Sequence, residues 1–135
     1  MSQEDTKFIV KLLNDTRKGT MAWSHLSSNS AFFHEFTVDA ARCNEALYCV
    51  IVSGPRKALA TVARVGVGHW EEETNSRWWT WTHSTYLCSQ HGNVVKELDV
   101  PAAISSQLFD EARLSAGSKE LGVLASYIAD DEKET

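Results

Sequence analysis

Long apolar runs are missing from this chain of 135 residues. The segment Met1–Lys7 is polar and acidic, whereas a secretory signal is basic and then apolar. No later stretch is apolar over the length that a membrane-spanning helix needs. We therefore predict a cytoplasmic protein with no membrane partner.

Positive charge is also in short supply. The chain carries 13 Lys and Arg against 18 Asp and Glu, for a formal net charge of −5. Binding to phosphate backbones needs a basic surface. The balance of charge therefore predicts no nucleic-acid partner.

Cysteine is scarce, and its spacing matches no known framework. Cys43, Cys49 and Cys88 are an odd number, and the chain is large enough to fold without disulfides. Cys88 and His91 form one Cys-x-x-His pair, but a structural zinc takes four ligands and no second pair is present. We predict free thiols, no disulfide and no metal.

Motifs for cofactors and nucleophiles are missing as well. Gly66-Val67-Gly68 lacks the third glycine and the following helix that dinucleotide binding needs, and there is no phosphate-binding Gly-Lys-Ser/Thr. A Gly-x-Ser-x-Gly nucleophile motif is also absent. The sequence therefore predicts no cofactor and no catalytic residue, and it favours a protein that is not an enzyme.

What is present is the composition of a folded domain, with 43% hydrophobic and 23% charged residues. The length predicts one domain over residues 1–135. Asp130, Asp131, Glu132 and Glu134 crowd like charges together, so residues from about 129 to 135 are expected to form an acidic, frayed tail.

Helical spacing of apolar residues appears near both ends of the sequence. The first pattern predicts a helix over residues 4–16, ended by Gly19. Pro101 suits the first turn of a second helix, which the segment Ser115-Ala116-Gly117 is expected to break. Leu121, Leu124, Tyr127 and Ile128 then indicate a short last helix.

Strand patterns fill the middle of the chain. Alternating or β-branched residues predict five strands, over residues 32–38, 46–52, 58–67, 77–88 and 94–100. Short turns between strands make them antiparallel neighbours. The expected fold is α+β, a single antiparallel sheet of about five strands with the N-terminal and C-terminal helices packed on one face.

The same periodicities predict which side chains form the core. The expected core residues are Phe8, Leu12, Phe36, Leu47, Val50, Ile51, Leu59, Val62, Leu108 and Ile128.

The segment Arg77–Cys88 is unusually rich in aromatic residues. Strand alternation directs Trp79, Trp81 and His83 to one face of the sheet, which we expect the helices to cover. It directs Trp78 and Tyr86 to the opposite face. That other face must be solvated, covered by a partner or curled around a cavity.

Two hypotheses for function follow. In the first, the chain is a non-catalytic protein-interaction domain that binds another protein or forms a homodimer, with Trp78 or Tyr86 as the interface anchor. In the second, the sheet curls into a cone-shaped α+β fold that binds a small molecule, or acts as a cofactorless enzyme. Its aromatic pocket is lined by His34, Trp79, Trp81 and His83.

Two segments carry a resemblance to a known pattern. They are Leu12–Gly19 followed by Trp23, and Val94–Leu98 leading to Leu108–Arg113. The chain resembles small, mostly uncharacterised bacterial and phage proteins that run helix, Thr-x-x-Gly turn, Trp, meander sheet and C-terminal helix. The resemblance implies that architecture and no activity.

Overall fold

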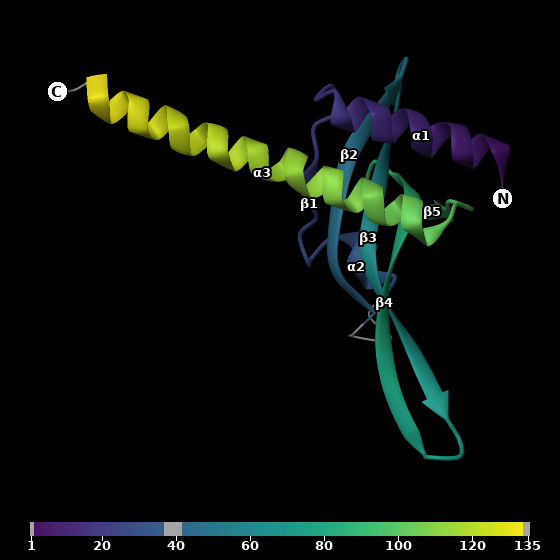
Figure 1. Ribbon diagram of the computed structural model, residues 1–135. Coiled ribbons are helices and arrows are strands. Elements are labelled where there is room, and N and C mark those ends of the chain that lie inside the picture. Colours follow the sequence, from purple (N-terminus) through teal and green to yellow (C-terminus); the bar gives the residue numbers. More distant parts are fainter. Residues whose placement is uncertain (1, 37–41, 134–135) are drawn as a thin grey trace.

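The protein has one antiparallel sheet with its two long helices on one face (Figure 1). The computed structural model describes residues 2–36 and 42–133, the latter without the side chains of 119–122 and 130–133. The elements are α1 (Gln3–Arg17), β1 (Ser24–His25), α2 (Ala31–His34), β2 (Cys43–Ser53), β3 (Arg56–Glu71), β4 (Ser76–Ser89), β5 (Val94–Glu97) and α3 (Ala102–Lys133). Neighbours in sequence are neighbours in the sheet. The predicted α+β class, with one antiparallel sheet between terminal helices, is confirmed.

Helix α1 begins and ends where its capping residues require. Ser2 is the N-cap, and its hydroxyl accepts a hydrogen bond from the Asp5 backbone N–H at 3.4 Å. After the helix, Gly19 has a φ of 78°, a left-handed conformation that glycine adopts without strain. Between these ends, Ile9, Leu12 and Leu13 are buried. Their helical spacing places them on one face of α1, and this face packs against the sheet.

Helix α3 is continuous through Lys133, so the predicted break at Ser115-Ala116-Gly117 is wrong. A glycine inside a helix costs only about 1 kcal/mol relative to alanine, and it ends a helix by taking a positive φ. Gly117 is not among the residues with positive φ. The described part of the expected tail, residues 129–133, is helical, and residues 134 and 135 lie outside the described residues.

The main core lies between the sheet and the two long helices. Side chains from α1, the loop after it, the sheet and the first half of α3 meet there. They are Ile9, Leu12, Leu13, Trp23, Leu47, Cys49, Ala60, Val62, Leu108, Phe109, Ala112 and Ala116. Burial of a large apolar side chain stabilises a fold by about 1.5–3 kcal/mol. This helix-side core therefore supplies most of the hydrophobic stabilisation.

The opposite face of the sheet has a smaller core, covered by the short helix α2. The predicted strand over residues 32–38 is wrong, because Ala31–His34 is helical, and β1 takes the place of that strand beside β2. Phe32, Phe33 and Phe36 also fit a helical spacing, and Phe32 is fully buried with its ring centroid 5.4 Å from that of Tyr86. Val38 lies outside the described residues.

Two of the predicted core residues are exposed. Val50 is 45% exposed on β2, beyond the cover of α2, and Ile128 is 50% exposed in the second half of α3. The other predicted core residues are buried (Leu12, Leu47, Leu59, Val62 and Leu108) or partly buried (Phe8, Phe36 and Ile51). Periodicity predicts which face of a helix or strand points toward the core. It does not predict how far along that helix or strand the neighbouring elements pack against it.

Strands β3 and β4 extend beyond the rest of the sheet as a two-stranded ribbon (Figure 1). Their pairing continues as far as Glu71 opposite Ser76. Trp79 and Trp81 are exposed, although their strand face is the one that the helices cover further along the sheet. Our assignment of these two indoles to the shielded face is therefore wrong, since the helices end before the ribbon does.

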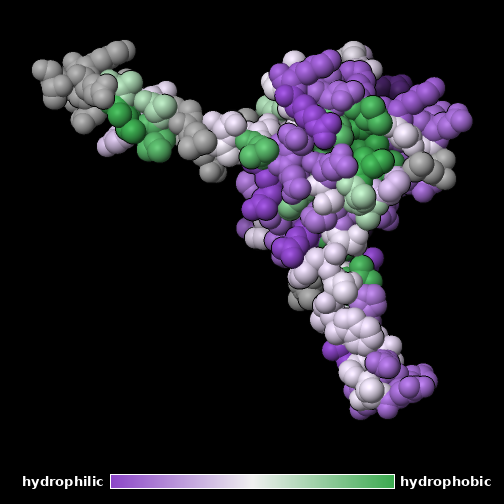
Figure 2. Space-filling view, viewed as in Figure 1, coloured by the Kyte–Doolittle hydropathy of each residue, from purple (hydrophilic) through white to green (hydrophobic). Residues whose placement is uncertain are grey.

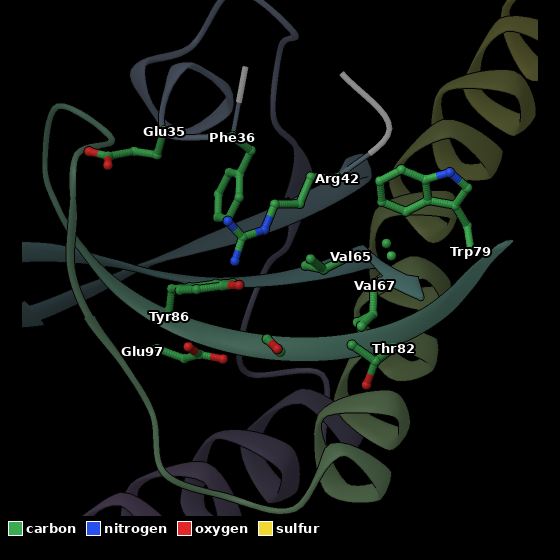
Figure 3. A pocket seen from close by; sticks show the side chains of 12 residues that line it. Glu35, Phe36, Arg42, Val65, Val67, Trp79, Thr82, Tyr86 and Glu97 are labelled. Carbon is green, nitrogen blue, oxygen red and sulfur yellow. The ribbon is translucent and has the colours of Figure 1, made fainter. Parts of the chain in front are cut away.

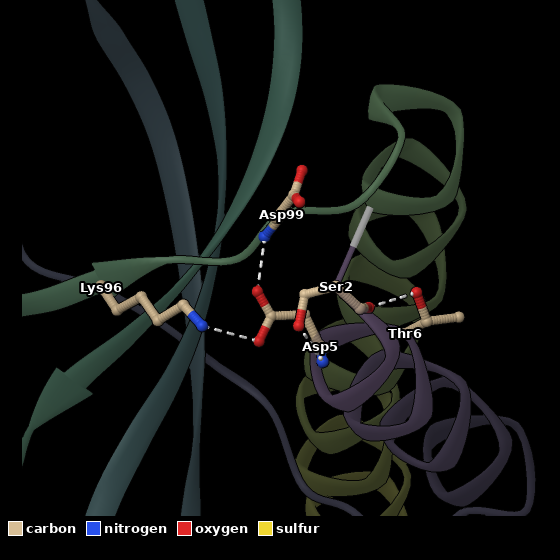
Figure 4. A network of polar contacts seen from close by, with 5 residues as sticks. All are labelled: Ser2, Asp5, Thr6, Lys96 and Asp99. Atoms are coloured by element: carbon tan, nitrogen blue, oxygen red, sulfur yellow. Dashed lines mark hydrogen bonds and ion pairs between the residues drawn. The ribbon is translucent and has the colours of Figure 1, made fainter.

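A buried carboxylate holds α1 against β5 and the turn that leads into α3 (Figure 4). Asp5 accepts a hydrogen bond from the backbone N–H of Asp99 at 2.7 Å and from Nζ of Lys96 at 2.9 Å. The backbone bond from Asp99, followed by the bond from Lys96, lowers the pKa of Asp5 below its ordinary value of 3.8. The charged form of Asp5 therefore stabilises the fold.

We expect Asp5→Asn to lower the urea midpoint at pH 7, because the amide loses the charge that Lys96 contacts. A lowered folded-state pKa stabilises the fold fully above the ordinary value of 3.8, and that stabilisation is lost as the pH falls through the folded-state pKa. The difference in midpoint should therefore shrink below pH 3.8. Glu4→Gln, on an exposed residue of the same helical turn, is the matched control. A difference that persists unchanged at low pH would contradict the role of the charge.

Candidate functional site

The second half of α3 projects away from the body of the protein (Figures 1 and 2). Among the side chains of α3 that the structure describes, the last buried one is that of Ala116. The side chains from Val123 to Ala129 are all exposed. We call the part of α3 from Gly117 to Lys133 the α3 arm. Figure 2 shows apolar surface along this projecting arm.

An apolar stripe follows one side of the α3 arm and continues onto the body. Leu114 is 67% exposed, and it is two heptads before Ile128, so both lie on the same side of the helix. Leu124 occupies the intervening position that a heptad pattern expects to be apolar. Val123 and Tyr127 widen the stripe, and Tyr127 is 75% exposed. This spacing is the one that a helix uses to pack against another helix.

A second concave surface lies on the outer face of the sheet, beside α2 (Figure 3). It is an open cavity of about 510 Å³ between α2 and the base of the ribbon. Phe36, Tyr86 and Trp79 supply aromatic surface, and the guanidinium of Arg42 lies 5.6 Å from the centre of the Phe36 ring. Glu35 and Glu97 add carboxylates to the lining. The cavity therefore combines aromatic walls with both signs of charge.

Tyr86 is buried by its own chain. Phe32 and Phe36 pack against its ring, with centroids 5.4 and 5.7 Å away. Burial, assisted by the nearby charge of Glu97, raises the pKa of Tyr86 to about 12, so the phenol is protonated at neutral pH. The reason for expecting a partner to bury Tyr86 is removed, because α2 does so.

Trp78, the other predicted interface residue, is 44% exposed on the ribbon. Its indole stacks on the ring of His69, with centroids 5.3 Å apart and planes 14° from parallel. His69 Nε2 also lies 2.7 Å from Thr80 Oγ1. These contacts link β3 to β4, as cross-strand pairs do in any antiparallel ribbon.

The four residues of the predicted aromatic pocket are not brought together. His34 is exposed on α2, on the outer face of the sheet, whereas His83 lies under α3 with its ring 4.7 Å from that of Phe109. Desolvation lowers the pKa of His83, which favours the neutral imidazole. Trp79 lines the outer cavity. Trp81 instead faces the guanidinium of Arg64, 4.9 Å from its ring centre.

The indoles of the ribbon have partners within the ribbon. Arg77 lies over Trp70, 5.8 Å from the ring centre. Gly68 faces Trp79 so closely that a Cβ at this position would lie 3.1 Å from the indole. Two-stranded ribbons are marginally stable alone, and such cation–π and ring-on-backbone contacts help to hold the strands together. These aromatic residues therefore have a structural role that needs no ligand.

The remaining reactive groups form no shared centre. Among the side chains that the structure describes, no three of His, Cys, Asp or Glu are grouped so as to hold a metal ion. Cys43, Cys49 and Cys88 are free thiols. None of the described helices combines the length and the apolar character needed to cross a membrane.

Comparison with known proteins finds no matching family model, no matching curated protein and no matching solved structure.

Sequence reasoning missed both surfaces, for different reasons. Leu124, Tyr127 and Ile128 were recognised at helical spacing, and their heptad relation to Leu114 is visible in the sequence once α3 is taken as continuous. No comparable signal exists for the outer cavity. It depends on Arg42 and Glu97, which are far apart in sequence and meet only when the sheet and α2 are assembled.

We expect the three thiols to be nearly unreactive toward Ellman's reagent in the native protein at pH 8. Burial raises the pKa of Cys43 to about 11 and that of Cys49 to about 12, and it also raises the pKa of Cys88. An increase of two units lowers the reactive thiolate fraction about 100-fold at a given pH. Reactivity should climb with pH, and unfolding in urea should release three fast thiols. Fewer than three in urea, or a native thiol that reacts at the unfolded rate, would contradict this.

Proposed function

We propose that this chain is a non-catalytic interaction protein that forms a homodimer through the apolar stripe of the α3 arm. The single observation that carries the proposal is the run of exposed apolar side chains, Leu114, Val123, Leu124, Tyr127 and Ile128, on a helix that projects from the body. A second copy of the same helix is the simplest partner for a stripe with heptad spacing, since two-fold dimers are the commonest oligomers.

The energetics of an isolated helix support a partner for the α3 arm. Most of the stability of helices in proteins comes from packing of an apolar face. None of the side chains described beyond Ala116 on α3 is buried. Burial of Leu124 and Ile128 against a second helix contributes about 1.5–3 kcal/mol for each side chain that is fully buried. Dimerisation thus supplies what the arm lacks in the single chain.

We expect sedimentation equilibrium at micromolar concentration to give about twice the chain mass of 15.1 kDa. Leu124→Glu combined with Ile128→Glu should shift the protein to monomer, because two carboxylates cannot be buried in an apolar seam without a large penalty. The helical signal in circular dichroism should fall at the same time, since the arm loses its packing.

The matched control is Ser126→Glu combined with Ala129→Glu. These residues are exposed and lie away from the heptad stripe, and the change adds the same charge to the same helix. The control should remain dimeric. A wild-type monomer, or a dimer that survives the Leu124 and Ile128 substitutions, would overturn the proposal, and dissociation by Trp78→Ala would move the interface to the ribbon.

The outer cavity favours a second candidate function, the binding of a small molecule. Its volume of about 510 Å³ lies in the range of ligand pockets. The lining combines a cation, Arg42, with two carboxylates and three aromatic rings. A small zwitterionic aromatic compound matches all three features, with its carboxylate toward Arg42 and its ammonium toward Glu35 or Glu97.

We expect L-phenylalanine, as a probe of this class, to bind weakly to the wild-type protein in isothermal titration calorimetry. Arg42→Ala should abolish the heat of binding, because the carboxylate loses its charged partner. Arg56→Ala, an exposed arginine at the β2–β3 turn, is the matched control. No binding to the wild-type protein at millimolar probe, or equal binding to both variants, would exclude this class of ligand at this cavity.

A further inference from the structure

A groove lies where the C-terminal end of α1 meets the middle of α3. Its volume is about 390 Å³, and its lining includes Arg17, Met21, Ala22, Leu114 and Ser118. Leu114 is the point at which the apolar stripe of α3 reaches the body of the protein. The groove therefore continues the stripe, and a helix that packs along the α3 arm would extend into it.

Positive charge lies at one end of the groove, where Arg17 is part of the lining and Lys18 follows it in the chain. Arg17 and Lys18 are exposed at the end of α1, and the Arg17 side chain is 49% exposed. Arg17 Nε lies 3.5 Å from Glu111 Oε1, so one carboxylate is also present there.

The end of the α3 arm has the opposite charge. The sequence places Asp130, Asp131 and Glu132 there against one cation, Lys133. The C-terminal end of a helix also carries the negative end of the helix dipole, so acidic residues at that end are unfavourable unless cations lie nearby. The acidic end of the arm and the basic end of the groove are thus complementary.

We infer that the two copies pair antiparallel, with the acidic end of each α3 arm lying in the groove beside Arg17 and Lys18 of the other copy. The inference rests on the proposed homodimer, and it adds a second surface and an orientation to it. A parallel pair would bring both acidic ends together and leave both grooves without a ligand. The antiparallel pair places each acidic end beside Arg17 and Lys18, at the level of Glu111, the carboxylate that Arg17 contacts within its own chain.

The spacing of the stripe fits this arrangement. Leu114 and Ile128 lie at equal distances on either side of residue 121, so a two-fold axis at that level sets Leu114 of one copy against Ile128 of the other. The same axis brings the small Gly117 close to the level of Leu124 in the opposite helix. Leu114 and Ile128 thus face each other, and Leu124 lies opposite the small residues Gly117 and Ser118.

Double electron–electron resonance distinguishes the two orientations. A nitroxide is attached to Gln107→Cys, an exposed position on α3, in a Cys43→Ser background where the two remaining cysteines are buried. With the axis at residue 121, the antiparallel dimer separates the two labels by about 42 Å along the helices, at 1.5 Å per residue. A parallel dimer keeps them within about 20 Å, because packed helices lie 8–10 Å apart.

Charge reversal tests the groove. Arg17→Glu combined with Lys18→Glu should weaken dimerisation about tenfold or more, and the loss should be largest at low salt. Arg56→Glu combined with Lys57→Glu makes the same change on another exposed Arg-Lys pair, at the β2–β3 turn, and should leave the dimer unchanged. Adding Asp130→Lys and Asp131→Lys to the groove variant should restore dimerisation. Circular dichroism verifies that each variant is folded.

The outcomes separate this inference from the proposed function. A wild-type monomer overturns the homodimer itself. A dimer with a label separation within about 20 Å keeps the homodimer and overturns the antiparallel orientation. A dimer with the long separation that is insensitive to charge reversal at Arg17 and Lys18 overturns the groove as the docking site. The long separation together with rescue by the Asp130 and Asp131 changes is the expected result.

Discussion

The indole of Trp23 joins both long helices to the edge of the sheet, and the point where α3 leaves the body depends on it. The side chain is fully buried, and its Nε1 donates to Thr16 Oγ1 at 2.9 Å, at the end of α1. The Trp23 backbone N–H donates to Ser115 Oγ at 3.3 Å, and that hydroxyl donates to the Met21 carbonyl at the same distance. Chain segments more than 90 residues apart are held together in this way. Beyond Ala116, no described side chain of α3 is buried, so the anchor marks where the α3 arm begins.

The two faces of the sheet differ in how they are covered, and this difference locates the surface available to a partner. On the helix side, α1 and α3 enclose the larger core. On the other side, α2 places Phe32 over Tyr86 and closes a smaller one. The expectation that a partner must cover Tyr86 assumed that all the helices lie on a single face. Because the chain covers this residue itself, the largest exposed apolar side chains gather on the α3 arm and the ribbon instead.

The fold class could be predicted from the sequence because it depends on local periodicity. The α1 pattern, the turn at Gly54 and the aromatic strand β4 each carry their signal within a few residues. The strand predicted around Phe32 is wrong because the aromatic residues of this segment fit both a strand and one helical turn. Only the contact of Phe32 with Tyr86 in the folded protein selects the helix. The break predicted at Gly117 is wrong because a glycine ends a helix only when its φ is positive, and the φ of Gly117 is not positive in the structure. The outer cavity could not be predicted, since Arg42, Trp79 and Glu97 become neighbours only through the assembled sheet.

The topology of the sheet has a consequence for how the protein emerges from the ribosome. Strands β2 to β5 pair in chain order through short turns, so each joins its neighbour at a low entropic cost and the meander can form as it is synthesised. Its helix-side surface, including Leu47 and Val62, has no complete cover until Leu108 and Phe109 have been translated. During that interval an apolar sheet face is open to solvent or to a chaperone. The rate of translation through α3 therefore sets how long the nascent chain is vulnerable to aggregation.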